Sequence, residues 1–101
     1  MTVNVKSDGG KITLVVDGKL GTTSASELER TVKENIDSAS ELIFDLEKVD
    51  YLASAGIRVL LSSAKAMKDK GSMKIINVTE PVMEVLNFTG MADALDVTPL
   101  T

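Results

Sequence analysis

The hydrophobic pattern of the stretch from Leu42 to Leu61 changes its period partway, and this change constrains the fold most strongly. Residues 42–46 form an apolar run that is too short for a helix and too continuous for a half-exposed strand, so we predict a strand covered on both faces. From Ser54 onward, apolar residues recur at spacings of three and four, the period of one helix face. These residues are Ile57, Leu60, Leu61, Ala64 and Met67. The stretch therefore predicts a strand, a short acidic loop and a helix.

Hydrophobic spacing and turn residues predict further elements on both sides of this unit. Strands are predicted over 3–5, 11–20, 72–78 and 95–97, and helices over 24–36 and 80–89. The segment Ser7–Gly10 is typical of a turn that closes a hairpin. Ser24 and Glu27 have the spacing of a capping box, which predicts that the first helix starts at Ser24.

The order of these elements predicts an α/β fold in a single domain that spans residues 1–101. We expect a mixed sheet of about five strands with helices packed on it. The first hairpin would be antiparallel, and right-handed crossovers would join the later strands. A chain of 101 residues is long enough for one core, with little to spare.

The amino-acid composition excludes several classes of function. The chain has no cysteine and no histidine, which removes disulfides, thiolate or imidazole metal sites, and Cys or Ser-His catalysis. Because a P-loop is also missing, we expect no enzyme activity, no cofactor and no metal site. The net charge of −4 and the aromatic content of 3% argue against nucleic acid and anionic membranes as partners. A protein partner with a basic surface is the better expectation.

The distribution of apolar residues predicts where the chain works. No apolar run is long enough to span a membrane, and no charged segment followed by an apolar one marks a secretory signal. We therefore expect a cytoplasmic protein. We also expect it to be a monomer or a weak dimer.

Ser54 is the first candidate for a functional residue. It lies at the start of a predicted helix, where backbone N–H groups lack intrahelical partners and the positive end of the helix dipole lies. A phosphoryl group on Ser54 would add about −1.5 to −2 charges at a position that tolerates an anion. The alternative is that Ser54 caps the helix, and helix physics alone favours this interpretation.

Three carboxylates form a second candidate site. Asp45, Glu47 and Asp50 lie at the end of the central strand and just after it, where open α/β sheets commonly bind ligands. They could bind a hard cation, or one of them could accept a phosphoryl group as in response-regulator receivers. A receiver needs a further acidic pair after its first strand, and this chain offers only Asp8 there. A solvated loop is the favoured interpretation.

Three segments, spread over nearly the whole chain, resemble the STAS domain of bacterial anti-sigma factor antagonists. The most specific is 44–56, Phe-Asp-Leu-Glu-Lys-Val-Asp-Tyr-Leu-Ala-Ser-Ala-Gly. There, as in the family, a hydrophobic strand leads through a short loop to a motif similar to Asp-Ser-Ser/Ala-Gly and to a helix. Residues 18–28 resemble the family's Gly-x-Leu-Asp segment with its helix, and residues 87–91 resemble its late helix end.

The resemblance implies a binding module without chemistry of its own, and hence no catalytic residues. In that family the unmodified domain binds an anti-sigma factor, which is also a serine kinase of the histidine-kinase-like ATPase fold, and so frees the sigma factor. The kinase phosphorylates the signature serine, which is Ser54 in this chain, and a serine phosphatase restores it. The partner-binding residues that the resemblance implies are Gly21, Thr22, Thr23, Ser24, Tyr51, Leu52, Ala53, Ala55, Gly56, Arg58, Phe88 and Met91.

Two positions of this chain depart from the family pattern. Ala53 stands where the family usually has the aspartate before the serine, and Gly21 stands where it often has the aspartate of Gly-x-Leu-Asp. Both departures remove negative charge from the expected docking face. They leave open a second hypothesis, in which the chain is a non-phosphorylated STAS subunit of a larger assembly such as a lipid-transport ABC complex.

Overall fold

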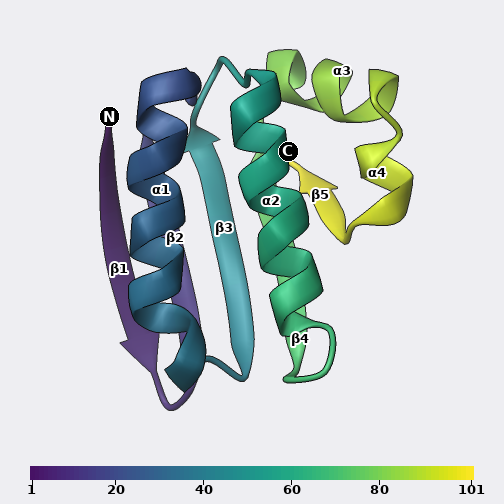
Figure 1. Ribbon diagram of the computed structural model, residues 1–101. Coiled ribbons are helices and arrows are strands. Elements are labelled where there is room, and N and C mark those ends of the chain that lie inside the picture. Colours follow the sequence, from purple (N-terminus) through teal and green to yellow (C-terminus); the bar gives the residue numbers. More distant parts are fainter.

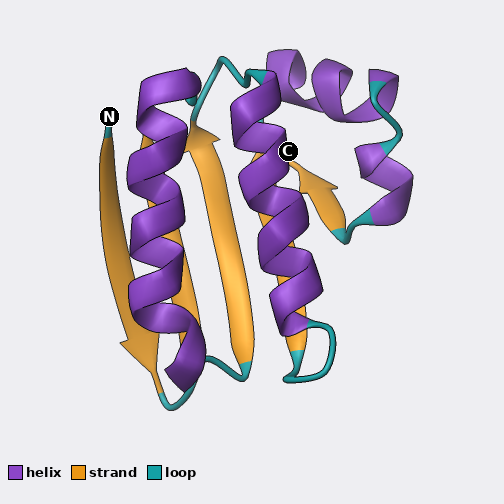
Figure 2. Ribbon diagram, in the orientation of Figure 1, coloured by secondary structure: helices purple, strands orange, loops and turns teal.

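A computed structural model describes all residues 1–101 and contains one sheet with helices packed on it (Figures 1 and 2). The strands are β1 Thr2–Asp8, β2 Lys11–Asp17, β3 Glu41–Lys48, β4 Ser72–Val78 and β5 Val97–Pro99. The helices are α1 Thr22–Asn35, α2 Ser54–Met67, α3 Glu80–Phe88 and α4 Met91–Ala94, with a 3₁₀ turn at Ile36–Ser38. The predicted α/β fold with a mixed sheet is confirmed.

The five strands lie in the sheet in the same order as in the chain, β1 to β5. β1 pairs with β2 in the antiparallel direction, and all later pairs are parallel. Gly9 and Gly10 have φ of +57° and +93°, so the hairpin turns within two residues. In Figure 1, each crossover from β2 to β3 and from β3 to β4 passes in front of the sheet to the strand on its right. For these two crossovers the expected right-handed connection is therefore confirmed.

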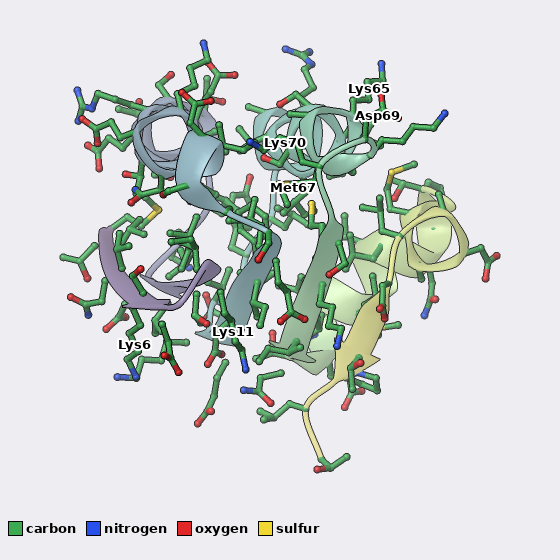
Figure 3. The ribbon with its side chains drawn as sticks, turned by 90° about the horizontal axis from the view of Figure 1, so that it is seen from below. Lys6, Lys11, Lys65, Met67, Asp69 and Lys70 are labelled. Atoms are coloured by element: carbon green, nitrogen blue, oxygen red, sulfur yellow. The ribbon has the colours of Figure 1, made fainter.

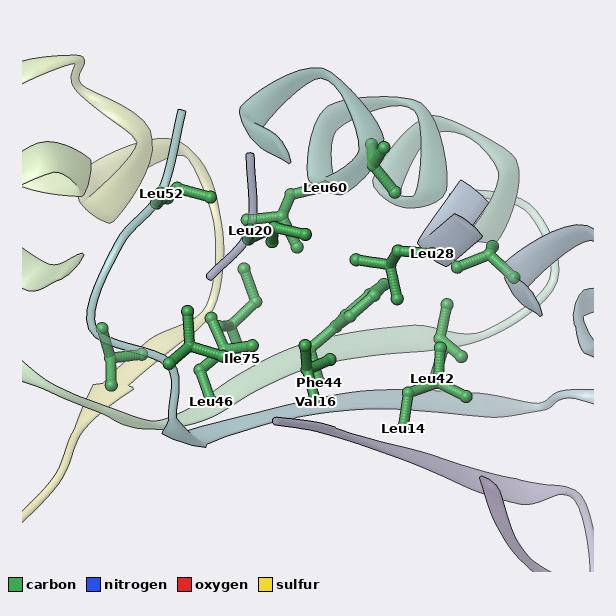
Figure 4. Packing of buried hydrophobic residues seen from close by; sticks show 14 of the residues in the cluster. Leu14, Val16, Leu20, Leu28, Leu42, Phe44, Leu46, Leu52, Leu60 and Ile75 are labelled. Carbon is green, nitrogen blue, oxygen red and sulfur yellow. The ribbon is translucent and has the colours of Figure 1, made fainter. Parts of the chain in front are cut away.

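The core lies between α1 and α2 and one face of the sheet (Figures 1 and 4). Alternate side chains of the central strands point into it, among them Leu14 of β2 and Phe44 of β3, and both are fully buried. Leu28 of α1 and Leu60 of α2 meet them from the helix layer. The change of period at the β3–α2 junction thus places apolar groups of both elements in one core.

The prediction that β3 is covered on both faces is confirmed at Leu42, Ile43 and Phe44, but no helix provides the cover on the second face. Figure 3 shows no helix on the sheet face opposite α1 and α2. Ile43 points to that face and lies outside the core cluster, although only 6% of its surface is exposed. Its register partners are Thr13 in β2 and Lys74 in β4, and the long stem of Lys74 can shield an apolar neighbour. Side chains within the sheet, and not a second helix layer, account for the continuous apolar run.

The buried face of α2 is rotated from the predicted one. Ile57, Leu61 and Ala64 are half-buried, while the residues fully buried from this helix are Gly56, Val59, Leu60, Ser63 and Met67. Ser63 can be buried because its hydroxyl donates to the Val59 carbonyl at 2.7 Å. Leu61 and Ala64 instead line an apolar hollow of about 380 Å³ beside β4 and α4.

Two strand predictions also differ from the structure, and one helix was not predicted. The strand predicted to reach Leu20 ends at Asp17, because Gly18 turns the chain with φ of +121°. The helix α4 was not predicted; it follows Gly90, whose φ of +78° reverses the chain after α3. The last strand covers Val97–Pro99 instead of 95–97, since α4 occupies residues up to Ala94.

Leu20→Ala should lower the free energy of unfolding by about 2 to 5 kcal/mol, because it removes a fully buried side chain and leaves a cavity. Leu100→Ala is the matched control: Leu100 is 43% exposed, and its truncation should cost less than about 1 kcal/mol. Denaturant unfolding of both variants would measure this. Equal losses would show that Leu20 does not anchor the core.

Candidate partner-binding and phosphorylation site

Ser54 is an exposed residue at the first position of α2. The residue before it, Ala53, is the N-cap in an extended conformation, and no side chain caps the helix. The interpretation of Ser54 as a cap is therefore wrong, because Ser54 is the first helical residue and Ala53 occupies the N-cap position. No acidic residue lies in the first turn of α2. The hydroxyl faces solvent beside backbone N–H groups that have no intrahelical partners.

The loop before Ser54 is fixed by the loop that leads into α1. The Leu20 N–H donates to the Tyr51 carbonyl at 2.9 Å, and the Ala53 N–H donates to the Leu20 carbonyl at 3.0 Å. These bonds form an isolated parallel bridge between Leu20 and Leu52. On the other side, the Thr79 hydroxyl donates to the Val49 carbonyl at 2.6 Å and attaches the loop to the end of β4. Two backbone hydrogen bonds on one side and one bond from a threonine hydroxyl on the other thus hold the segment before Ser54.

Gly56 permits a close approach between α2 and this bridge. A Cβ atom at position 56 would lie 2.6 Å from Leu52 Cδ1 and 2.8 Å from Leu20 Cγ, closer than ordinary contact. Gly56 is buried and Leu52 is only 5% exposed. Both belong to the predicted partner-binding residues, and in the structure they support the surface from below.

Ser24 braces the first loop in a way that the sequence analysis did not predict. α1 begins at Thr22 with Gly21 as N-cap, so the predicted capping box of Ser24 and Glu27 is wrong. The Ser24 hydroxyl accepts a hydrogen bond from the Gly21 N–H at 2.8 Å and donates to the Lys19 carbonyl at 2.7 Å. Ser24 is the third residue of the helix, and its hydroxyl binds the backbone of the N-cap residue. The start of α1 is therefore braced although glycine at the N-cap has no side chain.

Most of the predicted binding residues come together around Ser54. Gly21 to Ser24 lie at the start of α1, and Tyr51 to Arg58 lie at the start of α2; the two loops are bonded to each other. The accessible members are Gly21, Thr22, Thr23, Ser24, Tyr51, Ala53, Ser54, Ala55 and Arg58, which we call the Ser54 surface. A hollow of about 230 Å³ lies between the two helices and includes Thr22, Ala55 and Arg58 in its lining.

Phe88 and Met91 do not join this surface. Phe88 ends α3 and is 92% exposed, the most exposed large apolar side chain of the chain. In Figure 1, α3 extends away from the first turn of α2, and α4 with Met91 follows at its far end. Met91 is half-buried and packs against the core. The structure therefore divides the predicted residues into the Ser54 surface and a separate position at the end of α3.

The charges around the Ser54 surface are few and unevenly paired. Lys19 Nζ lies 3.7 Å from Asp50 Oδ1 and 5.7 Å from the centre of the Tyr51 ring. The side chains of this ion pair are more than 70% exposed, so the pair adds little stability. Arg58 is exposed and takes part in none of the chain's three ion pairs. Lys19 is not among the predicted site residues, although it lies within the Gly18–Gly21 segment that carries the resemblance.

The three carboxylates after the central strand do not form one site. Asp45 Oδ1 accepts hydrogen bonds from the Glu47 N–H at 3.1 Å and from Asn77 Nδ2 at 3.2 Å, while Asp50 pairs with Lys19. No group of three or more acidic, histidine or cysteine side chains is arranged to hold a metal ion. This geometry agrees with the solvated-loop interpretation.

None of the helices has the length and apolar character needed to cross a membrane.

Several known proteins that are similar to this chain are named anti-sigma factor antagonists. The anti-sigma-B factor antagonist of Bacillus subtilis (strain 168) is 26% identical over 98 residues, which cover 96% of this chain and 90% of that protein. The crystal structure of an anti-sigma factor antagonist from Mycobacterium paratuberculosis superposes with a TM-score of 0.88 at 21% identity, covering 97% of this chain and 85% of that one.

The anti-sigma factor antagonist SpoIIAA has a similar fold in two chemical states. Its unphosphorylated form has a TM-score of 0.83 at 14% identity, covering 95% of this chain and 87% of that one. The phosphorylated form of SpoIIAA, a Bacillus cell fate determinant, has a TM-score of 0.75 at 13% identity, with coverages of 95% and 90%. At these identities the likeness shows the fold alone. The sequence profile of the STAS domain matches residues 2–100, and the chain therefore belongs to the STAS domain family.

Proposed function

We propose that this chain is an anti-sigma factor antagonist: it binds an anti-sigma factor that is also a serine kinase of the histidine-kinase-like ATPase fold, and it releases the sigma factor. Phosphorylation of Ser54 by that kinase ends the complex, and a serine phosphatase restores it. The observation that carries the proposal is the exposed Ser54, which is not used as a cap and lies amid a surface built from two loops. The full-length likeness to a named antagonist supports it.

The unmodified Ser54 surface is suited to close docking. The residues around Ser54 are small and uncharged: Gly21, Thr22, Ala53 and Ala55. Tyr51 stands beside them and is 50% exposed, and tyrosine is enriched at the centres of protein interfaces. Because the two loops are fixed by backbone hydrogen bonds, binding would order little additional chain. The surface offers contact area with few charges to desolvate.

Phosphorylation would change this surface without requiring a change of fold. The Ser54 oxygen forms a bond to the γ-phosphorus of ATP as the bond to the β-phosphate oxygen breaks, and the hydroxyl proton leaves to a base on the kinase. The product carries about −1.5 to −2 charges and three acceptor oxygens. A partner that had packed on a neutral hydroxyl would have to desolvate this charge. A few kcal/mol would change the affinity by more than tenfold.

The proposal also covers the setting in which the chain works. The chain acts in the cytoplasm as one STAS domain, as a monomer or a weak dimer, and it binds its partners through protein contacts without a cofactor. The absence of an acidic residue in the first turn of α2 favours a second candidate function. In it, a kinase that reads a carboxylate beside the serine does not act, and the chain is a permanent subunit of a larger assembly, such as a lipid-transport ABC complex. A stable stoichiometric complex recovered from cells would favour this second function.

Ser54→Asp should weaken binding to the purified anti-sigma kinase at least about tenfold, because a charge must be desolvated in the interface. Ser54→Ala should bind as tightly as the unsubstituted chain and accept no phosphate from ATP. Ser62→Asp is the matched control, since Ser62 is an exposed serine two turns further along α2. Titration calorimetry with each variant provides the affinities. An equal loss in Ser54→Asp and Ser62→Asp would refute a specific role of position 54.

Tyr51→Ala should weaken the same complex by about tenfold or more, as expected for a tyrosine near the centre of an interface. Phe88→Ala should weaken it by less than about threefold, because the end of α3 lies apart from the Ser54 surface. Both changes remove an exposed aromatic ring, so they control for each other. If Phe88→Ala had the larger effect, the partner would dock on α3 and the proposed surface would be wrong.

A further inference from the structure

We propose that Arg58 binds the phosphate of phosphorylated Ser54. The modification would then draw the Arg58 guanidinium from the hollow between α1 and α2 toward Ser54. This inference rests on the proposed phosphorylation and adds the residue that receives the phosphate. Arg58 would be a positioning residue: it would hold the new group against α2 after the kinase has left.

The spacing of the two residues brings their side chains together. Ser54 and Arg58 lie on the same helix four residues apart, and both are exposed. Residues at this spacing are neighbours on the helix surface, with Cβ atoms about 5 to 6 Å apart. Side chains of a helix also lean toward its N-terminus, so the guanidinium of Arg58 can reach a group on Ser54.

No carboxylate of the chain holds Arg58 in another position. Glu29 lines the same hollow, but its carboxylate lies 3.7 Å from Lys33. Asp50 lies 3.7 Å from Lys19, and the first turn of α2 contains no acidic residue. The loss of negative charge at Ala53 therefore leaves Arg58 without a competing anion on its own helix. The guanidinium is available when a phosphate forms.

Arg58 is also better suited to the phosphate than Lys19, the other cation near the surface. A guanidinium presents a planar fork of N–H donors that can bind two phosphate oxygens at once, whereas an ammonium acts as a point charge. Lys19 already lies beside Asp50 and over the Tyr51 ring. Arg58 in the unmodified chain faces the hollow between α1 and α2. On phosphorylation it would turn to Ser54, and the hollow would lose its cation.

The test uses the full chain with phosphoserine installed at position 54 during translation, and the probe is the second pKa of that phosphate, followed by phosphorus NMR. A nearby guanidinium favours the doubly charged phosphate, so Arg58→Gln should raise this pKa by about half a unit or more. Arg58→Lys should give a smaller rise, because the charge remains and the fork is lost. Lys65→Gln is the matched control and should leave the pKa within about 0.1 unit.

Lys65 is suited to this control because it is an exposed cation on the same helix, near the end opposite Ser54 (Figure 3). Equal pKa values for Arg58→Gln and Lys65→Gln would overturn the proposal. Thermal unfolding of each variant, followed by circular dichroism, verifies that the fold is intact. Since the phosphate is installed without a kinase, the result does not depend on whether cells phosphorylate Ser54. Failure of the proposed function and failure of this inference therefore remain distinguishable.

Discussion

The bridge between Leu20 and Leu52 is the contact on which the arrangement of the site depends. It joins the loop before α1 to the loop before α2 by two backbone hydrogen bonds, and both leucines are buried beneath it. Gly56 brings the first turn of α2 onto the same pair, because a side chain there would collide with them. Two segments that are about thirty residues apart in the chain thus form one surface whose shape is set by the core.

This support explains how one hydroxyl can be exposed and yet be held in a fixed position. Ser54 is accessible on the first turn of α2, while Leu20, Leu52 and Gly56 beneath it are buried. A new phosphate would meet solvent and Arg58, and it would not enter the core. Stability and signalling therefore depend on different residues: the leucines hold the fold, and the small residues above them make the surface that a partner contacts.

Much of the fold could be predicted because local patterns determine it. The change of period between β3 and α2 placed the start of the helix at Ser54, and Gly9 with Gly10 predicted the hairpin turn. The wrong predictions depended on contacts that a single sequence does not show. Serine is a common N-cap residue, but Ser24 lies inside the helix, and its hydroxyl accepts a hydrogen bond from the Gly21 N–H. In the same way, no local pattern revealed that one face of β3 lacks a helix, or that α3 carries Phe88 away from the Ser54 surface.

The proposed switch at Ser54 is tested most directly by phosphopeptide and intact-mass analysis of the protein purified from its own cells, together with the proteins that co-purify with it. Two pools of the protein are expected. One carries phosphate on Ser54 and is free, and the other is unmodified and bound to an ATPase-fold kinase. A chain that is unmodified under every growth condition and held in one constant complex would contradict the switch, and the permanent-subunit function would replace it.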